Sequence, residues 1–150
     1  MIEVEVEDEA WAVAIVDVEA VVVTAADAAL GKVAGVVTVL LADDETVRDL
    51  NARFRGKDRP TNVLSFPAAP MPGAVPEPLG DIILAYGTCA SEAEAQTKSL
   101  ADHLRHLVVH GVLHLLGRDH ESDAEAEAME AEEREILSGL GVSDPYRAVA

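Results

Sequence analysis

Apolar and polar residues alternate along the chain in patterns that predict four strands. Residues 2–7 alternate apolar and acidic side chains with a period of two, which is typical of a strand with one buried and one solvated face. The run 36–41 is β-branched and almost continuously apolar, which predicts a central strand covered on both faces. Residues 61–66 and 80–86 favour two further strands. We therefore expect a small sheet.

Four segments outside these strands have the composition of helices. The Ala-rich segment 16–30 contains neither Pro nor Gly, and the segment that ends at Arg55 begins after an aspartate able to cap a helix. Two more helices are predicted at 100–116 and 122–140, the first largely buried and the second acidic on its outer side. Between the third and fourth strands, the Pro-rich segment 67–78 predicts an irregular loop.

The composition fits one globular domain over residues 1–150. Hydrophobic residues make up 49% of the chain and are chiefly Ala, Val and Leu, so we expect a core of small and branched aliphatic side chains. A chain of this length can bury about two-thirds of its unfolded surface around one core.

Features of the sequence indicate a protein of the cytoplasm. No uninterrupted apolar run approaches the ~20 residues that a membrane helix needs. The chain opens with acidic residues, whereas a secretory signal opens with basic ones. The single cysteine, Cys89, cannot form an internal disulfide, which suits a reducing compartment. We expect neither a membrane association nor a disulfide-linked partner.

Charge is distributed unevenly along the chain. The formal net charge of -17 argues against attraction of the whole surface to polyanions. The carboxylates from Asp123 to Glu135 recur along a predicted helix in the way expected of a solvated face. Five of the eleven basic residues nevertheless lie within twelve positions, namely Arg48, Arg53, Arg55, Lys57 and Arg59. The sequence therefore predicts a local basic patch on an acidic body.

Three histidines in the segment HGVLHLLGRDH predict a metal site. His110 and His114 are four residues apart, so on a helix they differ by about 40° around the axis and both rings can reach one ion at ~2.0–2.1 Å. On an unbroken helix His120 would lie roughly 15 Å beyond His110. Gly117 can end the helix and turn the chain back. Three protein ligands leave a fourth position for water, as in catalytic zinc sites.

Two other interpretations of this segment are weaker. The first is that the histidines are ordinary polar residues on a partly exposed helix. This would leave unexplained why the four-residue spacing, the helix breaker and the third histidine all fit a metal site. The pattern H-x-x-x-H-x-x-G-x-x-H also occurs in metzincin proteases, in which a glutamate after the first histidine acts as general base. Here that position is Gly111, so peptide hydrolysis is disfavoured and another electrophile is the better substrate.

The histidine segment resembles the signature of the YbeY endoribonucleases, which are bacterial ribosomal RNA maturation factors. Residues 50–67 (LNARFRGKDRPTNVLSFP) resemble the second signature of that family, residues 80–82 the start of its next strand, and residues 144–146 its ending. The resemblance covers most of the chain from about residue 35 onward. Arg118 departs from it, because the family more often has an aromatic residue or histidine there.

The resemblance implies a zincin-like α+β fold with a small mixed sheet and one zinc ion per chain, held by His110, His114 and His120. It implies cleavage of single-stranded RNA in small-subunit rRNA 3′-end maturation and ribosome quality control. The implied partners are rRNA and the small ribosomal subunit or its assembly factors. The alternatives are a zinc hydrolase of peptides or small amides and a non-catalytic ribosome-assembly factor with structural zinc.

The basic patch supplies the expected phosphate contacts. Arg55 matches the position that the family uses, and we expect it, with His114, to be catalytic, its guanidinium holding a phosphate through two hydrogen bonds. The alternative is that Arg55 only solvates a helix end. Lys57 and Arg59 are expected either to attract phosphate or to lie in a solvated loop.

Three further residues have two interpretations each. Ser65 either contacts the substrate at a sheet edge or has a role in the core or the strand ladder. His106, one turn before His110, either contacts substrate or supports a ligand, or it is a buried histidine bonded to a backbone carbonyl. Asp119 either accepts a ring proton from His114 or His120 or caps the following helix.

Overall fold

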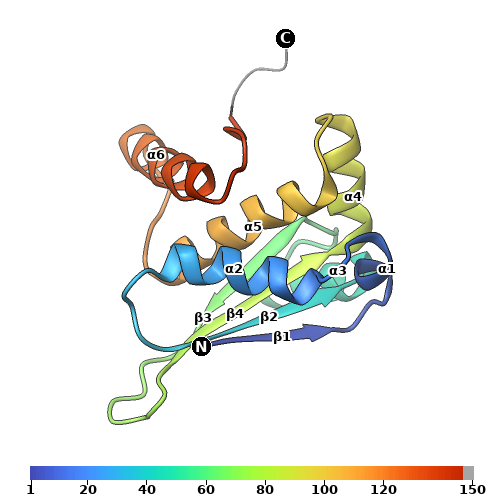
Figure 1. Ribbon diagram of the computed structural model, residues 1–150. Helices are drawn as coiled ribbons and strands as arrows, with labels where there is room; N and C mark the ends of the chain where they lie inside the picture. The colour runs from blue at the N-terminus through green and yellow to red at the C-terminus, as the bar shows by residue number, and fades with distance from the viewer. Residues whose placement is uncertain (147–150) are drawn as a thin grey trace.

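Strands and helices follow one another along the computed structural model, which describes residues 1–146 (Figure 1). Within these residues the strands are β1 (Ile2–Val6), β2 (Val36–Ala42), β3 (Val63–Pro67) and β4 (Pro78–Ala85). The helices are α1 (Ala10–Ala14), α2 (Val18–Leu30), α3 (Asp44–Arg55), α4 (Tyr86–Ala95), α5 (Leu100–Leu115) and α6 (Asp123–Gly139).

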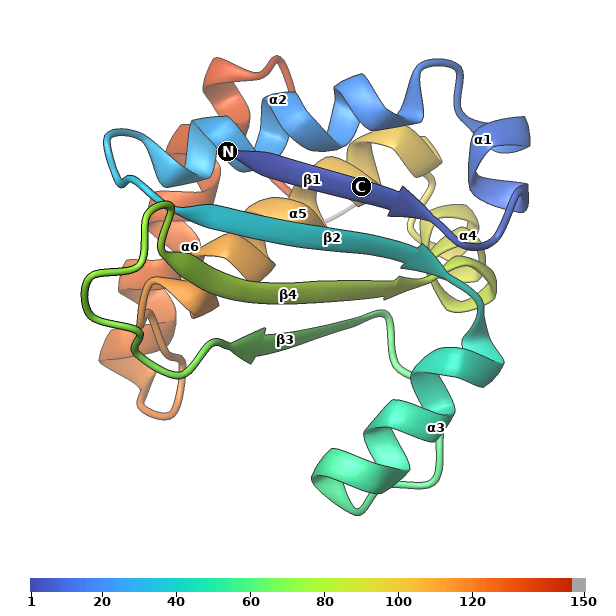
Figure 2. The same ribbon diagram turned by 90° about the horizontal axis from the view of Figure 1, so that it is seen from below.

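The strands form one mixed sheet in the order β1-β2-β4-β3 (Figure 2). The β1–β2 and β2–β4 pairs are parallel, whereas β3 runs antiparallel to β4 and forms an edge of the sheet. Val39 lies opposite Val4 and Ile82, and Ser65 lies opposite Ile82 on the other side of β4. The α+β fold with a small four-stranded mixed sheet is thus confirmed, as is the central place of β2.

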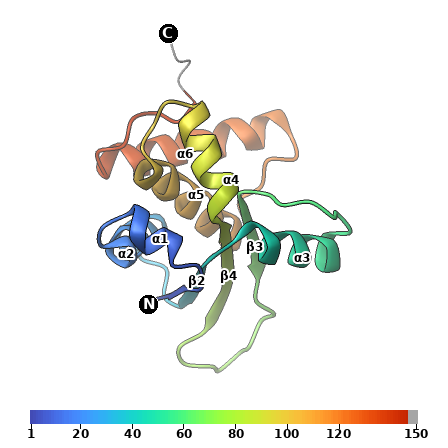
Figure 3. The same ribbon diagram turned by 90° about the vertical axis from the view of Figure 1, so that its right-hand side faces the viewer.

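The main core lies between one face of the sheet and helices α2 and α5. Val37, Val39 and Leu41 of β2 point into it and are fully buried, while the intervening residues of β2 are only half-buried. Among the described residues, α3 is the one helix that packs on the opposite face, at the side of β3 and β4 (Figure 3), where Val47 joins Leu64 in a smaller cluster. The expectation that β2 is covered on both faces is therefore wrong, because one short helix cannot cover that face.

Two helices were not expected from the pattern. The predicted helix 16–30 starts at Val18, because Asp17 adopts a left-handed conformation (φ 54°) that separates it from the short helix α1. Helix α4 follows β4 directly and buries only Cys89 and Ala93, so it has little apolar periodicity to reveal it. The predicted α3 is confirmed: the Asp43 side chain accepts a hydrogen bond from Thr46 N at 2.8 Å.

No helix in residues 1–146 combines the length and the apolar content that crossing a membrane requires. Cys89 is a free, buried cysteine on α4. Burial raises the pKa of its thiol well above the ordinary value, and nearby Glu92 adds to this effect. The thiol therefore stays protonated and packs as a small apolar side chain.

Candidate metal centre

The three histidines of the predicted metal site converge where α5 ends. His110 and His114 lie on the last two turns of α5, and Gly117 (φ 91°) turns the chain so that His120 comes back beside them. The ring centroids are 4.5 Å apart for His110 and His114, 5.0 Å for His114 and His120, and 5.8 Å for His110 and His120. One ring nitrogen from each histidine lies within 4.8 Å of the others. The expected helix break at Gly117 is confirmed.

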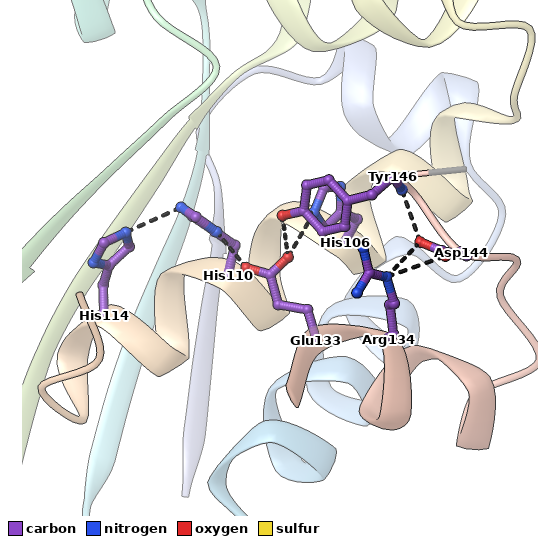
Figure 4. A network of polar contacts seen from close by, with 7 residues as sticks. All are labelled: His106, His110, His114, Glu133, Arg134, Asp144 and Tyr146. Carbon is purple, nitrogen blue, oxygen red and sulfur yellow. Dashed lines mark hydrogen bonds and ion pairs between the residues drawn. The ribbon is translucent and has the colours of Figure 1, made fainter. Parts of the chain in front are cut away.

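A buried carboxylate orients the first of these histidines. The Nδ1 atom of His110 lies 2.6 Å from Oε1 of Glu133 on α6, and its Nε2 atom faces Nε2 of His114 at 3.0 Å (Figure 4). Metal-bound histidines commonly donate the second ring N–H to a carboxylate, which fixes the tautomer and the ring orientation. Glu133 therefore leaves the Nε2 lone pair of His110 directed at the position between the three rings.

Glu133 has three polar partners and no exposed side-chain surface. Its Oε2 atom lies 3.0 Å from Nε2 of His106 and accepts a short hydrogen bond from the Tyr146 hydroxyl. Burial by itself would raise the pKa of Glu133, but the bonds from His106, His110 and Tyr146 lower it to about 2. Glu133 is therefore an ionised carboxylate inside the protein.

The prediction that Glu133 lies on a solvated face is wrong. The other carboxylates between Asp123 and Glu135 are exposed or half-buried, so the prediction fails at this one position. Met129, Glu133 and Leu137 are the buried residues of α6 and recur at four-residue intervals. A carboxylate on an apolar stripe was the available signal, because such a group needs partners to be buried.

The segment after α6 holds Tyr146 over the centre. Asp144 accepts a hydrogen bond from Tyr146 N at 2.9 Å and pairs with Arg134 of α6 at 3.1 Å. The Arg134 guanidinium lies 5.4 Å from the Tyr146 ring centroid (Figure 4). Tyr146, His110 and His120 then line a hollow of about 210 Å³. Burial and the Glu133 carboxylate raise the pKa of Tyr146, so the phenol remains a donor.

These residues fit a metal ion. Burial lowers the pKa of His114, and the neighbouring His110 and His120 lower it further, which favours the neutral imidazole that a metal binds. Three nitrogen donors match a site with protein ligands on one side and an open position on the other. The buried negative charge of Glu133, behind His110, would stabilise a metal cation held by the three histidines. The cluster can therefore hold one metal ion.

Gly111 explains why no glutamate follows His110. A Cβ atom at this position would lie 3.0 Å from Cδ1 of Ile82 and 3.2 Å from Oγ of Ser65. The helix α5 therefore approaches the sheet closely, and a larger side chain would require Ile82 and Ser65 to shift. The position that carries the general base in metzincin proteases is Gly111 in this protein, and it faces the sheet.

Ser65 connects the histidine helix to the predicted phosphate-binding arginine. The Ser65 hydroxyl lies 3.5 Å from the carbonyl oxygen of Gly111, and the Ser65 carbonyl accepts a hydrogen bond from Arg55 at 3.0 Å. The Arg55 guanidinium also lies 5.6 Å from the Phe66 ring centroid. Arg55 is thereby held at the outer edge of β3, on the strand that passes the histidine centre.

The basic patch divides into paired and unpaired cations. Arg48 pairs with Asp58 at 2.8 Å and Arg53 with Asp49 at 3.2 Å. Within residues 1–146, no ion pair involves the other three basic residues of the patch. These three residues line a hollow of about 420 Å³ beside β3, and they are Arg55, Lys57 and Arg59.

The structure bears on two other residues, His106 and Asp119, for which the sequence allowed two roles each. His106 is 13% exposed at its side chain and is bonded to Glu133, so its position favours support of His110 through that carboxylate over a direct substrate contact. Asp119 accepts from the backbone N–H of His120 at 2.7 Å, and Ser122 caps α6 instead. Asp119 thus performs neither of the two roles considered for it.

A short sheet beside a helix with two histidines, with a third supplied after a glycine turn, defines a zincin-like protein with a candidate metal site. The family model described as Endoribonuclease YbeY matches residues 3–141. The chain belongs to the YbeY family, as its sequence motifs indicated.

Relatives agree with this membership, and a solved structure is similar in fold. The chain is 54% identical over 152 residues to the Endoribonuclease YbeY of Azorhizobium caulinodans, with 97% of this chain and 95% of that protein covered. It is 53% identical over 155 residues to that of Paramagnetospirillum magneticum, covering 97% and 94%. The solution structure of TM1509 from Thermotoga maritima is similar in fold, with a TM-score of 0.56, 24% identity and coverage of 99% and 100%.

Proposed function

We propose that this protein is a zinc-dependent endoribonuclease that cleaves single-stranded RNA. The observation that carries the proposal is the convergence of three histidines in front of a buried carboxylate, beside cations that have no acidic partner in the described chain. Both relatives named above are endoribonucleases by name. Phosphodiester groups are anions. The three cations of the basic patch that are unpaired within residues 1–146 attract them locally, although the protein as a whole has a net charge of -17.

Each residue of the centre has a distinct part in this proposal. His110, His114 and His120 would hold one zinc ion per chain, which when bound polarises a phosphoryl oxygen and activates water. Glu133 keeps the His110 ring turned toward the ion. Arg55 holds the phosphate at the edge of β3, where its guanidinium is already positioned by the Ser65 carbonyl. Zinc is preferred because three imidazoles and an open position are typical of its catalytic sites.

The finer parts of the proposal concern the biological substrate. We infer that the RNA is ribosomal, that cleavage serves small-subunit rRNA 3′-end maturation and ribosome quality control, and that the protein works in the cytoplasm with the small subunit or its assembly factors. The support for this is the match of the chain to the YbeY family over residues 3–141. Lys57, Arg59 and Ser65 would contact the RNA backbone along β3.

Chelation tests the proposal directly. We expect about one zinc per chain by elemental analysis, and cleavage of a single-stranded RNA that is lost after chelator treatment and regained when zinc is restored. A double-stranded RNA of the same sequence should be resistant. Stoichiometric zinc without cleavage would instead support an assembly factor, and cleavage of unstructured protein would support a hydrolase of peptides or amides.

Replacement of Arg55 by alanine is expected to lower kcat/KM for RNA cleavage by about a hundredfold, the loss typical of one transition-state donor. Zinc content should stay the same, because Arg55 contacts no histidine of the centre. Arg53→Ala is the matched control, since Arg53 lies on the same helix and pairs with Asp49. Equal rates for the two variants would contradict the assigned role of Arg55.

A further inference from the structure

The hollow beside β3 contains one carboxylate among its cations. Glu92 of α4 lines it together with Asn62 and the three cations Arg55, Lys57 and Arg59. Glu92 forms no ion pair with these three cations in the described chain; its partner is the ring of His103, at 2.9 Å. A hollow of about 420 Å³ lies in the range of ligand sites in proteins. Cations and a carboxylate in the same hollow suit a ligand that carries both an anionic group and a hydrogen-bond donor.

Two donors hold one oxygen of Glu92 in place. The Oε1 atom accepts from Nδ2 of Asn62 at 3.0 Å and lies 2.9 Å from Nε2 of His103. The Oδ1 atom of Asn62 accepts from Val63 N at 2.7 Å, so the amide cannot turn around. Since Oε1 is occupied, Oε2 is the oxygen of this fixed carboxylate that remains for a ligand.

The environment of His103 favours a neutral imidazole that donates a hydrogen bond to Glu92. Its side chain is 3% exposed, and its Nδ1 atom has no hydrogen-bond partner within residues 1–146. Burial lowers the pKa of His103, although the bond to Glu92 opposes this shift. A neutral ring with its proton on Nε2 donates to Glu92 and leaves Nδ1 as a bare acceptor.

The hollow lies next to the histidine centre along the same strand. Val63 lines the hollow, and Ser65, two residues or about 7 Å further along β3, contacts Gly111 of the histidine helix. Arg55 belongs to both places, because it lines the hollow and donates to the Ser65 carbonyl. An RNA strand cleaved at the centre would therefore place a neighbouring nucleotide here.

We propose that this hollow is a base-reading subsite, in which Glu92 accepts hydrogen bonds from the Watson–Crick edge of an unpaired guanine next to the cleaved bond. Guanine offers two adjacent donors, N1–H and the N2 amino group, and the two lone pairs of Oε2 can accept from them. Uracil offers one donor between two carbonyl oxygens, which a carboxylate repels. Reading this edge requires an unpaired base, so the subsite also favours single strands. The inference rests on the proposed RNA substrate.

Nucleotide titrations of the full chain as purified test this subsite without any cleavage. GMP and UMP share ribose and phosphate, so a difference in affinity reports on the base alone. We expect GMP to bind about tenfold more tightly than UMP, the discrimination of one good base contact. In two-dimensional NMR spectra the amide shifts should centre on residues 57–64 and 88–92. Equal affinities, or no shifts in these segments, would overturn the inference.

The variant Glu92→Gln should abolish this preference. Asn62 and His103 both donate to the oxygen that they hold, so the glutamine carbonyl takes that place and its NH₂ group turns into the hollow. An NH₂ group cannot accept from guanine N1–H or N2, and it donates to uracil O4 or guanine O6 alike, so the variant should bind both nucleotides and lose the preference for GMP. Glu94→Gln, at an exposed position of the same helix, should keep the preference for GMP.

The nucleotide-binding test of the subsite and the RNA cleavage test of the proposed function can fail independently. If the chain cleaves RNA but binds GMP and UMP equally, the proposed endoribonuclease stands and the base-reading subsite falls. If the chain prefers GMP but cleaves no RNA, the subsite stands and the proposed activity falls. A Glu92→Gln variant that folds and keeps the GMP preference would remove Glu92 from recognition.

Discussion

His114→Ala is expected to abolish RNA cleavage and to leave the protein folded but unable to bind zinc tightly. The centre then retains His110 and His120, which cannot replace the three-nitrogen site. Loss of metal-ion catalysis removes several kcal/mol of transition-state stabilisation, so kcat/KM should fall on the order of a thousandfold or more. Single-turnover cleavage of a labelled RNA, together with zinc analysis of the same sample, measures both effects.

Thermal unfolding separates loss of the ion from loss of the fold. Zinc at about a thousand times its dissociation constant stabilises a folded protein by about 4 kcal/mol, so it should raise the Tm of the wild type and leave that of His114→Ala unchanged. The chelated wild type and the variant should melt at similar temperatures. Arg105→Ala is the control on the same helix, where Arg105 pairs with Asp102. Cleavage by a metal-free His114→Ala protein would exclude the proposed metal centre.

Glu133→Ala is expected to weaken zinc binding by 10- to 100-fold, the usual effect of removing a carboxylate behind a metal-bound histidine. Without Glu133, the His110 ring loses its 2.6 Å partner and can rotate. The donors of His106 and Tyr146 also lose a buried acceptor, which costs about 1–3 kcal/mol of folding free energy. Competition with a chromophoric zinc chelator measures the affinity, and thermal unfolding of the chelated protein measures the stability.

A conservative variant distinguishes positioning from simple packing. Glu133→Gln keeps the volume and one acceptor for His110, so zinc affinity should recover in part, although its NH₂ group faces the donors of His106 and Tyr146. Glu135→Gln, on the exposed side of the same helix, should bind zinc as the wild type does. With zinc replaced by Co²⁺, the absorption spectrum should change for Glu133→Ala and stay the same for Glu135→Gln. An unchanged affinity and spectrum in Glu133→Ala would remove Glu133 from the metal centre.

Residues close together in the chain determined what the sequence could predict. The His110–His114 spacing and the break at Gly117 follow from helix geometry and glycine conformation alone. The cap at Asp43 is equally local, because its acceptor reaches a backbone N–H three residues away. The strands of the sheet were recognisable from period-two patterns and apolar runs, although their ends moved by one or two residues. Local chemistry therefore predicted the strands, four of the helices and the histidine triad, and the family resemblance supplied the fold class.

Contacts between distant segments decided the rest. Glu133 lies 23 residues from His110, and Ser65 lies 46 residues from Gly111. Periodicity along a helix shows which face is apolar, but a carboxylate becomes buried only where other elements bring donors to it. The same holds for Glu92, whose partners are Asn62, directly before β3, and His103 on α5. The sequence by itself determined which residues can bind a metal; the packing of α5, α6 and β3 decided which charged groups surround it.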